Sequence, residues 1–205
     1  KHGSLMFEFN DKVIHVDPVM RMTDYSKLPD ADMILITHHH GDHFDLNAIH
    51  ELKKEDTKTL VTKKCKDNAE EFEPTEILTD HDQITMLDLE IKSVPAYNLV
   101  HKRDNGDPYH PKGEGNGYII SFGDKKVYIA GDTENIPEMK SLKDIDIAFL
   151  PMNLPYTMTP EMVADAAKAF KPKILYPYHY GNTDTSRLVE LLKQETGIEV
   201  RIRKM

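Results

Sequence analysis

The chain has 205 residues, of which 39% are hydrophobic and 30% charged, a balance typical of a soluble globular protein. No apolar run approaches the ~20 residues of a membrane-spanning helix, and the single cysteine, Cys65, excludes an internal disulfide and a cysteine-cage zinc site. The net charge of −9 argues against a nucleic-acid partner, because nucleic-acid-binding proteins carry a basic surface. We therefore expect a small-molecule substrate and neither a nucleic-acid nor a membrane partner.

The N-terminal part of the chain shows short apolar runs separated by turn signals. Asn10-Asp11 predicts a turn between two strands, and Pro18 cannot continue a central strand. Helices are predicted at residues 45–54 and 65–72. Strands are predicted at residues 4–9, 12–16, 32–37, 58–62 and 76–79.

The C-terminal part continues with strands, a long irregular segment at residues 98–117 and two helices. Thr159 and Pro160 predict one helix start, while Ser186 and Gly197 predict the start and end of the other. Further strands are predicted at residues 83–87, 89–94, 117–122, 125–130, 145–150, 173–178 and 198–203. This succession of elements predicts two sheets with helices outside.

The strongest functional signal is the run Thr37-His38-His39-His40-Gly41-Asp42-His43 after a buried strand. His38 and His40 are two residues apart, so on an extended strand end they point to one face. Gly41 permits the tight turn that re-aims Asp42 and His43. Imidazole and carboxylate groups bind zinc, iron, manganese or nickel, so this loop can offer ligands to two adjacent metals. A solvated polyhistidine stretch would not interleave glycine and aspartate in this way.

The pattern H-x-H-x-D-H after a buried strand resembles the metallo-β-lactamase superfamily of hydrolases. The resemblance covers nearly the whole chain, and the order of motifs is most similar to the ascorbate-6-phosphate lactonase branch. It implies an α+β fold, a four-layer αββα sandwich of two mixed sheets with outer helices, as a single domain over residues 1–205. The other segments that carry the resemblance are Lys1-His2-Gly3-Ser4, Asp17-Pro18, Ala130-Gly131-Asp132-Thr133 and Tyr176-Pro177-Tyr178-His179.

The resemblance also implies a set of metal ligands. His38, His40 and a third histidine would hold the first metal. Asp42, His43 and His179 would hold the second, and Asp132 would bridge the two.

The third histidine departs from the family pattern. Many members carry P-A-x-H, but here Pro95-Ala96-Tyr97 is followed by Asn98, a poor ligand for transition metals. The replacement must come from the following loop, which contains His101 and His110. We favour His110, because the segment from Tyr109 to Gly113 resembles a Y/F-H-P-K motif of relatives that bear P-A-Y-N.

The function implied is a metal-dependent hydrolase with two divalent ions, zinc first, with manganese, iron or nickel as alternatives. A hydroxide shared by the two metals would attack a small polar ester, lactone or phosphoester. Asp132 would bridge the metals and Asp42 would orient the hydroxide, which makes both carboxylates catalytic. A non-catalytic metal-binding or ligand-sensing protein is the alternative, and a nuclease is disfavoured by the acidic charge.

Other residues of the pattern could lie around the metals or the substrate: His2, Asn98, Tyr156 and Lys112. The sequence leaves the compartment open, either cytoplasmic or, if a removed signal peptide preceded Lys1, periplasmic. Because the chain begins directly in motif sequence, an N-terminal strand could also precede it. Homo-oligomer formation is compatible with the sequence but not predicted by it.

Overall fold

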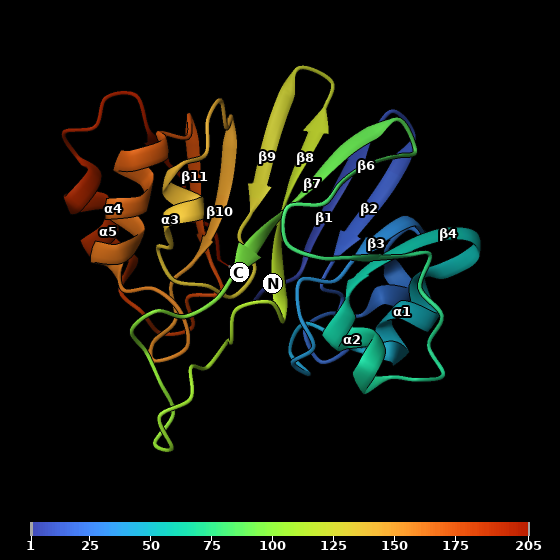
Figure 1. Cartoon of the computed structure of the whole chain (residues 1–205). Coiled ribbons are helices and arrows are strands. Elements are labelled where there is room, and N and C mark those ends of the chain that lie inside the picture. The colour runs from blue at the N-terminus through green and yellow to red at the C-terminus, as the bar shows by residue number, and fades with distance from the viewer. Residues whose placement is uncertain (1, 205) are drawn as a thin grey trace. The chain divides into compact units, whose positions relative to one another are not determined.

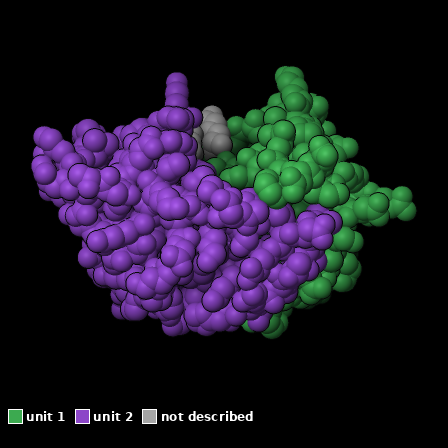
Figure 2. Space-filling model, turned by 90° about the horizontal axis from the view of Figure 1, so that it is seen from above, with its two compact units in different colours: residues 1–79 green, residues 80–205 purple. Residues whose placement is uncertain are grey.

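The computed structural model describes residues 2–204 of the chain. The chain forms two compact units, Lys1–Thr79 and Asp80–Met205, which Figure 2 distinguishes by colour. Each unit contains one mixed β-sheet and its own helices. The prediction of one domain over residues 1–205 stays a prediction.

The sheet of the first unit has the strand order β1-β2-β3-β4-β5. Figure 1 labels its first four strands. β1 and β2 pair antiparallel, and the remaining neighbours pair parallel. The β1–β2 turn is formed by Asn10 and Asp11, whose φ angles of 47° and 59° fit a tight hairpin turn of the primed type. The strands are β1 (Leu5–Phe9), β2 (Lys12–Val16), β3 (Ala31–Leu35), β4 (Lys53–Thr62) and β5 (Glu76–Leu78).

Three short helices complete the first unit: η1 (Tyr25–Lys27), α1 (Leu46–Leu52) and α2 (Lys63–Asn68). The Asp45 carboxylate caps α1 by accepting from the backbone N–H of Asn47 and Ala48. Apolar side chains of α1 and α2, such as Ile49 and Cys65, are buried in one cluster with Ile34 of β3. This cluster holds the helices against the sheet whose strand ends carry the histidine loop.

The sheet of the second unit has the order β12-β11-β10-β9-β8-β7-β6. β9 to β12 pair parallel and β6 to β9 pair antiparallel. The strands are β6 (Gln83–Met86), β7 (Leu89–Ala96), β8 (Gly115–Phe122), β9 (Lys125–Ile129), β10 (Ile147–Pro151), β11 (Ile174–Tyr178) and β12 (Glu199–Val200).

Three helices pack on the second sheet: α3 (Pro137–Lys140), α4 (Pro160–Phe170) and α5 (Thr185–Leu192). Thr159 caps α4 as predicted, because its side chain accepts from the N–H of Met162. Phe170 of α4 is 4% exposed and its ring meets the Tyr128 ring of β9 edge-on, at 6.1 Å between centroids. Helix and sheet side chains thus share one apolar core.

Several boundaries differ from the sequence prediction. Asp184, and not Ser186, caps α5, because its carboxylate accepts from the N–H of Ser186 at 2.9 Å. α5 ends at Leu192, so Gly197 does not terminate it. The predicted closing strand is reduced to β12, since only two of its residues pair with the edge of β11.

Other elements were longer, shorter or unexpected. β4 begins at Lys53, whereas the prediction placed the start of this strand at residue 58. α2 ends at Asn68, whereas the prediction extended this helix to residue 72. η1 and α3 were not predicted, because elements of three and four residues are too short to show a helical period. Within residues 2–204, no helix has the length and apolar character needed to cross a membrane.

The packing of α4 predicts the effect of a core truncation. Phe170→Ala should lower the free energy of unfolding by about 3–5 kcal/mol, because it leaves a cavity beside Tyr128. Val189→Ala, at a position 44% exposed on α5, should stay within about 0.5 kcal/mol of the wild type. Chemical denaturation of both variants measures the difference, and equal losses would contradict this packing.

Candidate metal centre

The buried carboxylate of Asp17 organises the histidine loop of the first unit. It follows β2 with a left-handed φ of 46° and is 0% exposed. Its Oδ1 accepts from the N–H of Thr37 at 2.7 Å, and its Oδ2 accepts from the Thr37 hydroxyl at 2.6 Å and from His43 Nδ1 at 2.8 Å. An ionised carboxylate only accepts, so the proton of His43 lies on Nδ1 and the lone pair on Nε2.

The same network orients His38. The Thr37 hydroxyl gives its one proton to Asp17, so it accepts from His38 Nδ1 at 3.0 Å. His38 therefore also carries its lone pair on Nε2. The ring centroids of His38 lie 4.8 Å from His40 and 4.1 Å from His43, so the predicted imidazole donors of this loop are gathered together.

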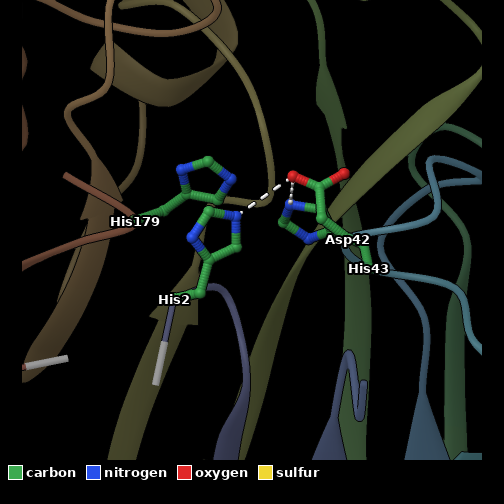
Figure 3. Close-up of side chains that lie close together, drawn as sticks. All are labelled: His2, Asp42, His43 and His179. Carbon is green, nitrogen blue, oxygen red and sulfur yellow. Dashed lines mark hydrogen bonds and ion pairs between the residues drawn. The ribbon is translucent and has the colours of Figure 1, made fainter. Parts of the chain in front are cut away.

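Asp42 lies beside His43 and His2, as Figure 3 shows. Its Oδ2 is 3.1 Å from His2 Nε2 and 3.9 Å from His43 Nε2. The Asp42 side chain is 30% exposed, whereas the His43 side chain is 0% exposed. Gly3 packs on the His43 ring so closely that a Cβ at this position would stand 2.6 Å from His43 Cε1. The N-terminal segment thus supports this ring, which no larger residue than glycine could do without displacing it.

The second unit has its own cluster of donors around Asp132. Asp132 Oδ2 lies 3.4 Å from His110 Nε2 and 3.6 Å from His179 Nε2, and all three residues are buried. Asp132 follows β9, with Gly131 at a φ of 65° turning the chain, and His179 follows β11. The amide of Asn153, after β10, lies 3.5 Å from His179 Nδ1. The ends of neighbouring parallel strands therefore bring these groups together.

Asn98 is hydrogen-bonded to His110. Its Oδ1 accepts from the backbone N–H of His110 at 2.9 Å and from His110 Nδ1 at 2.7 Å. The Asn98 N–H donates to the His110 carbonyl at 2.9 Å. The amide oxygen of Asn98 therefore accepts both hydrogen bonds from His110. The other ring nitrogen of His110, Nε2, lies beside Asp132.

Glu134 receives the backbone of the segment that follows Asn98. It is 0% exposed and accepts from the N–H groups of Leu99, Val100 and His101, each at 2.7 Å. His101 Nδ1 also lies 2.6 Å from Glu134 Oε1. Burial acts to raise the pKa of Glu134, but the hydrogen bonds outweigh it and the pKa is lowered, so the group stays a carboxylate.

The remaining predicted residues lie at the edges of this second cluster. The Tyr156 carbonyl accepts from Asn98 Nδ2 at 2.9 Å, and its 45% exposed side chain packs edge-on against the Tyr109 ring. Lys112 donates to Glu138 Oε1 at 2.7 Å and lies over the Tyr97 ring. A direct role of Tyr156 or Lys112 with substrate stays a prediction.

The sequence prediction named neither Asp17 nor Glu134 as a site residue. Asp17 was noted only in an acid-proline motif. Its place directly after a strand is the sequence signal for its role as hydrogen-bond acceptor of the histidine loop. Glu134 stands two residues after Asp132, but its partners become adjacent only through the fold. Cys65 takes no part, because burial raises its pKa to about 11 and the reactive thiolate is absent near neutral pH.

These two clusters fit divalent metals. They offer imidazole nitrogens and carboxylate oxygens, which is the mixed donor set of zinc, manganese, iron and nickel sites. His38, His43 and His110 each have an Nδ1 partner that directs the lone pair to Nε2, as metal-binding histidines do. Fold and donors together define a metallo-β-lactamase type of domain.

Comparison with known proteins supports this class. The family described as "Beta-lactamase superfamily domain" matches residues 1–179. The chain is 30% identical over 182 residues to a UPF0173 metal-dependent hydrolase of Nanoarchaeum equitans, covering 87% of this chain and 80% of that protein. It is 32% identical over 157 residues to a UPF0173 metal-dependent hydrolase of Thermococcus onnurineus, covering 74% of this chain and 67% of that protein.

Solved structures agree. A protein from Parabacteroides distasonis ATCC 8503 superposes with a TM-score of 0.93 at 50% identity, covering 100% of this chain and 90% of that one. Igni18, a metallo hydrolase of Ignicoccus hospitalis, has a TM-score of 0.80 at 24% identity, covering 99% of this chain and 92% of that one, and shows the shared fold. The chain belongs to the metallo-β-lactamase superfamily, and the predicted superfamily and α+β fold class are confirmed. The ascorbate-6-phosphate lactonase branch stays a prediction.

The role of Asp17 predicts that its charge is needed for the histidine loop. Asp17→Asn leaves one oxygen where the carboxylate has two, so either the Thr37 N–H or the Thr37 hydroxyl and His43 Nδ1 lose the oxygen that accepts from them. The free energy of unfolding should fall by about 1–3 kcal/mol, measured by chemical denaturation. Asp24→Asn, at a side chain 52% exposed, is the matched control and should change stability by less than about 0.5 kcal/mol.

Proposed function

We propose that the protein is a metal-dependent hydrolase that cleaves an ester, lactone or phosphoester bond of a small polar molecule. The observation that carries the proposal is shared by His38, His43 and His110. Nδ1 of each ring is hydrogen-bonded to another residue, so the lone pair that can bind a metal lies on Nε2. Similar proteins in Nanoarchaeum equitans and Thermococcus onnurineus are named metal-dependent hydrolases, which supports the same reaction class here.

We assign the ligands as the resemblance implies. His38, His40 and His110 would hold the first metal. Asp42, His43 and His179 would hold the second, and Asp132 would serve both. His110 is preferred to His101 because His110 Nε2 lies 3.4 Å from Oδ2 of Asp132, the acid expected to serve both metals.

The chemistry is divided between the metals and the carboxylates. When bound, divalent metals supply Lewis-acid activation of water and of the substrate oxygen. Asp42 has the more exposed of the two predicted catalytic carboxylates and would orient the attacking water. Asp132 is buried, and its Oδ2 lies within 3.6 Å of Nε2 of both His110 and His179. Zinc is proposed first, and manganese, iron and nickel bind the same donor set.

A non-catalytic metal-binding or ligand-sensing protein is the competing function, since it needs the same donors. The two are separated by a hydrolysis panel of esters, lactones and phosphodiesters with the metal-loaded protein. Turnover of a member of the panel that is lost in both Asp42→Ala and Asp132→Ala supports the hydrolase. Full metal occupancy with no turnover across the panel supports the sensing protein.

Metal content tests the ligand assignment directly. Elemental analysis of protein purified without a polyhistidine tag should give about two metals per chain. His110→Ala should fall to about one, because one site loses a ligand, and His101→Ala should keep about two. Unchanged content in His110→Ala with loss in His101→Ala would transfer the assignment to His101. Wild-type protein that binds no added zinc, manganese or nickel would remove the proposed function.

A further inference from the structure

The loop after β7 contains Asn98 at the position where the family resemblance implies a histidine, and this side chain is 7% exposed. Asn98 uses its whole amide. Nδ2 donates to Glu134 Oε1 at 3.1 Å and to the Tyr156 carbonyl at 2.9 Å, while Oδ1 accepts from the N–H and Nδ1 of His110. A side-chain amide has two donors and two acceptor positions, so its hydrogen-bonding capacity is filled.

These partners permit one orientation of the amide. If the amide were turned over, its NH₂ group would face the backbone N–H of His110. Its oxygen would face the Glu134 carboxylate and the Tyr156 carbonyl, neither of which can donate. Glu134 and Tyr156 therefore determine that the oxygen of Asn98 faces His110.

Glu134 also fixes the backbone on which Asn98 is carried. Its two oxygens accept from three successive backbone N–H groups, those of residues 99–101, and from the His101 ring. Successive N–H groups that converge on one buried carboxylate leave the segment little freedom to rotate. His101 is thereby part of the support of this segment.

We propose that Glu134 and Asn98 are positioning residues that act in series: Glu134 orients the amide of Asn98, and Asn98 holds His110 with its proton on Nδ1 and its lone pair on Nε2. The inference rests on the proposed function, in which His110 is a metal ligand. It explains how a chain without the histidine of P-A-x-H keeps a third imidazole donor. By the resemblance, the third histidine is expected at the position of Asn98, and here that side chain orients His110, 12 residues further along.

Metal affinity tests the proposal. Asn98→Ala removes the acceptor of His110 Nδ1 and should weaken zinc binding by about 10–100-fold at one site, measured by competition with a chromophoric chelator. Asn105→Ala is the matched control, because Asn105 lies in the same loop and its exposed amide contacts only Asp107 among the hydrogen bonds described for it. The control should keep wild-type affinity at both sites.

A second readout follows the proton itself. In protein labelled with ¹⁵N-histidine, the His110 Nδ1 resonance should be that of a protonated ring nitrogen, and in Asn98→Ala this preference should be lost. A general loss of structure would shift the other histidines too, whereas the proposal predicts a change centred on His110. Glu134→Gln should shift His110 in the same direction, because a glutamine side chain cannot accept all the N–H groups that Glu134 accepts.

The outcomes are separable. Wild-type affinity and an unchanged His110 resonance in Asn98→Ala would overturn the inference, as would a His110 in the wild type whose Nδ1 lacks the proton. If Asn98→Ala does not fold, Glu134→Gln and the wild-type resonance decide. If His110→Ala keeps both metals, the ligand assignment of the proposed function fails, while the resonance still reports whether Asn98 orients His110.

Discussion

A neutral imidazole has one proton and one available lone pair on its ring nitrogens, so a histidine binds metal through Nε2 with its proton on Nδ1, and an acceptor at Nδ1 stabilises that form. The donor clusters of both units are built around this constraint. In the first unit Asp17 accepts a hydrogen bond from Nδ1 of His43, and Thr37 accepts one from Nδ1 of His38. In the second unit Asn98 accepts a hydrogen bond from Nδ1 of His110. The backbone geometry around the strand ends is organised by these acceptors.

The acceptors are buried and differ in kind. Asp17 is a carboxylate that accepts without regard to orientation, and it needs no further partner to define its role. Asn98 has a donor end and an acceptor end, so it needs Glu134 and Tyr156 to determine which end faces the ring. The amide of Asn98 brings no second carboxylate to the His110 ring, whose Nε2 already lies 3.4 Å from Asp132 Oδ2.

Local pattern predicted most of the fold and the donor-rich loop. The loop at residues 37–43 could be predicted because histidine, glycine and aspartate follow a buried strand in direct succession. The start of α4 could be predicted from Thr159 and Pro160. The helix cap at Asp184 and the short β12 were missed, since neighbouring polar residues compete for a cap and edge pairing depends on the partner strand. The contacts of Asn98 could not be predicted, because they join residues 12 and 36 positions apart through side chains.

The long loop between β7 and β8 is fastened near its two ends rather than along its length. Residues 98–101 are tied to Glu134, and His110 is tied back to Asn98 on both its backbone and its ring. Between them lies an excursion made mostly of exposed residues, closed by a β-bridge between Lys102 and Pro108 and by the Arg103 N–H, which donates to the Asp107 carbonyl. Insertions or deletions in this excursion would leave His110 in place. The loop tip is therefore the part of the site where related sequences can vary in length without loss of the donor set.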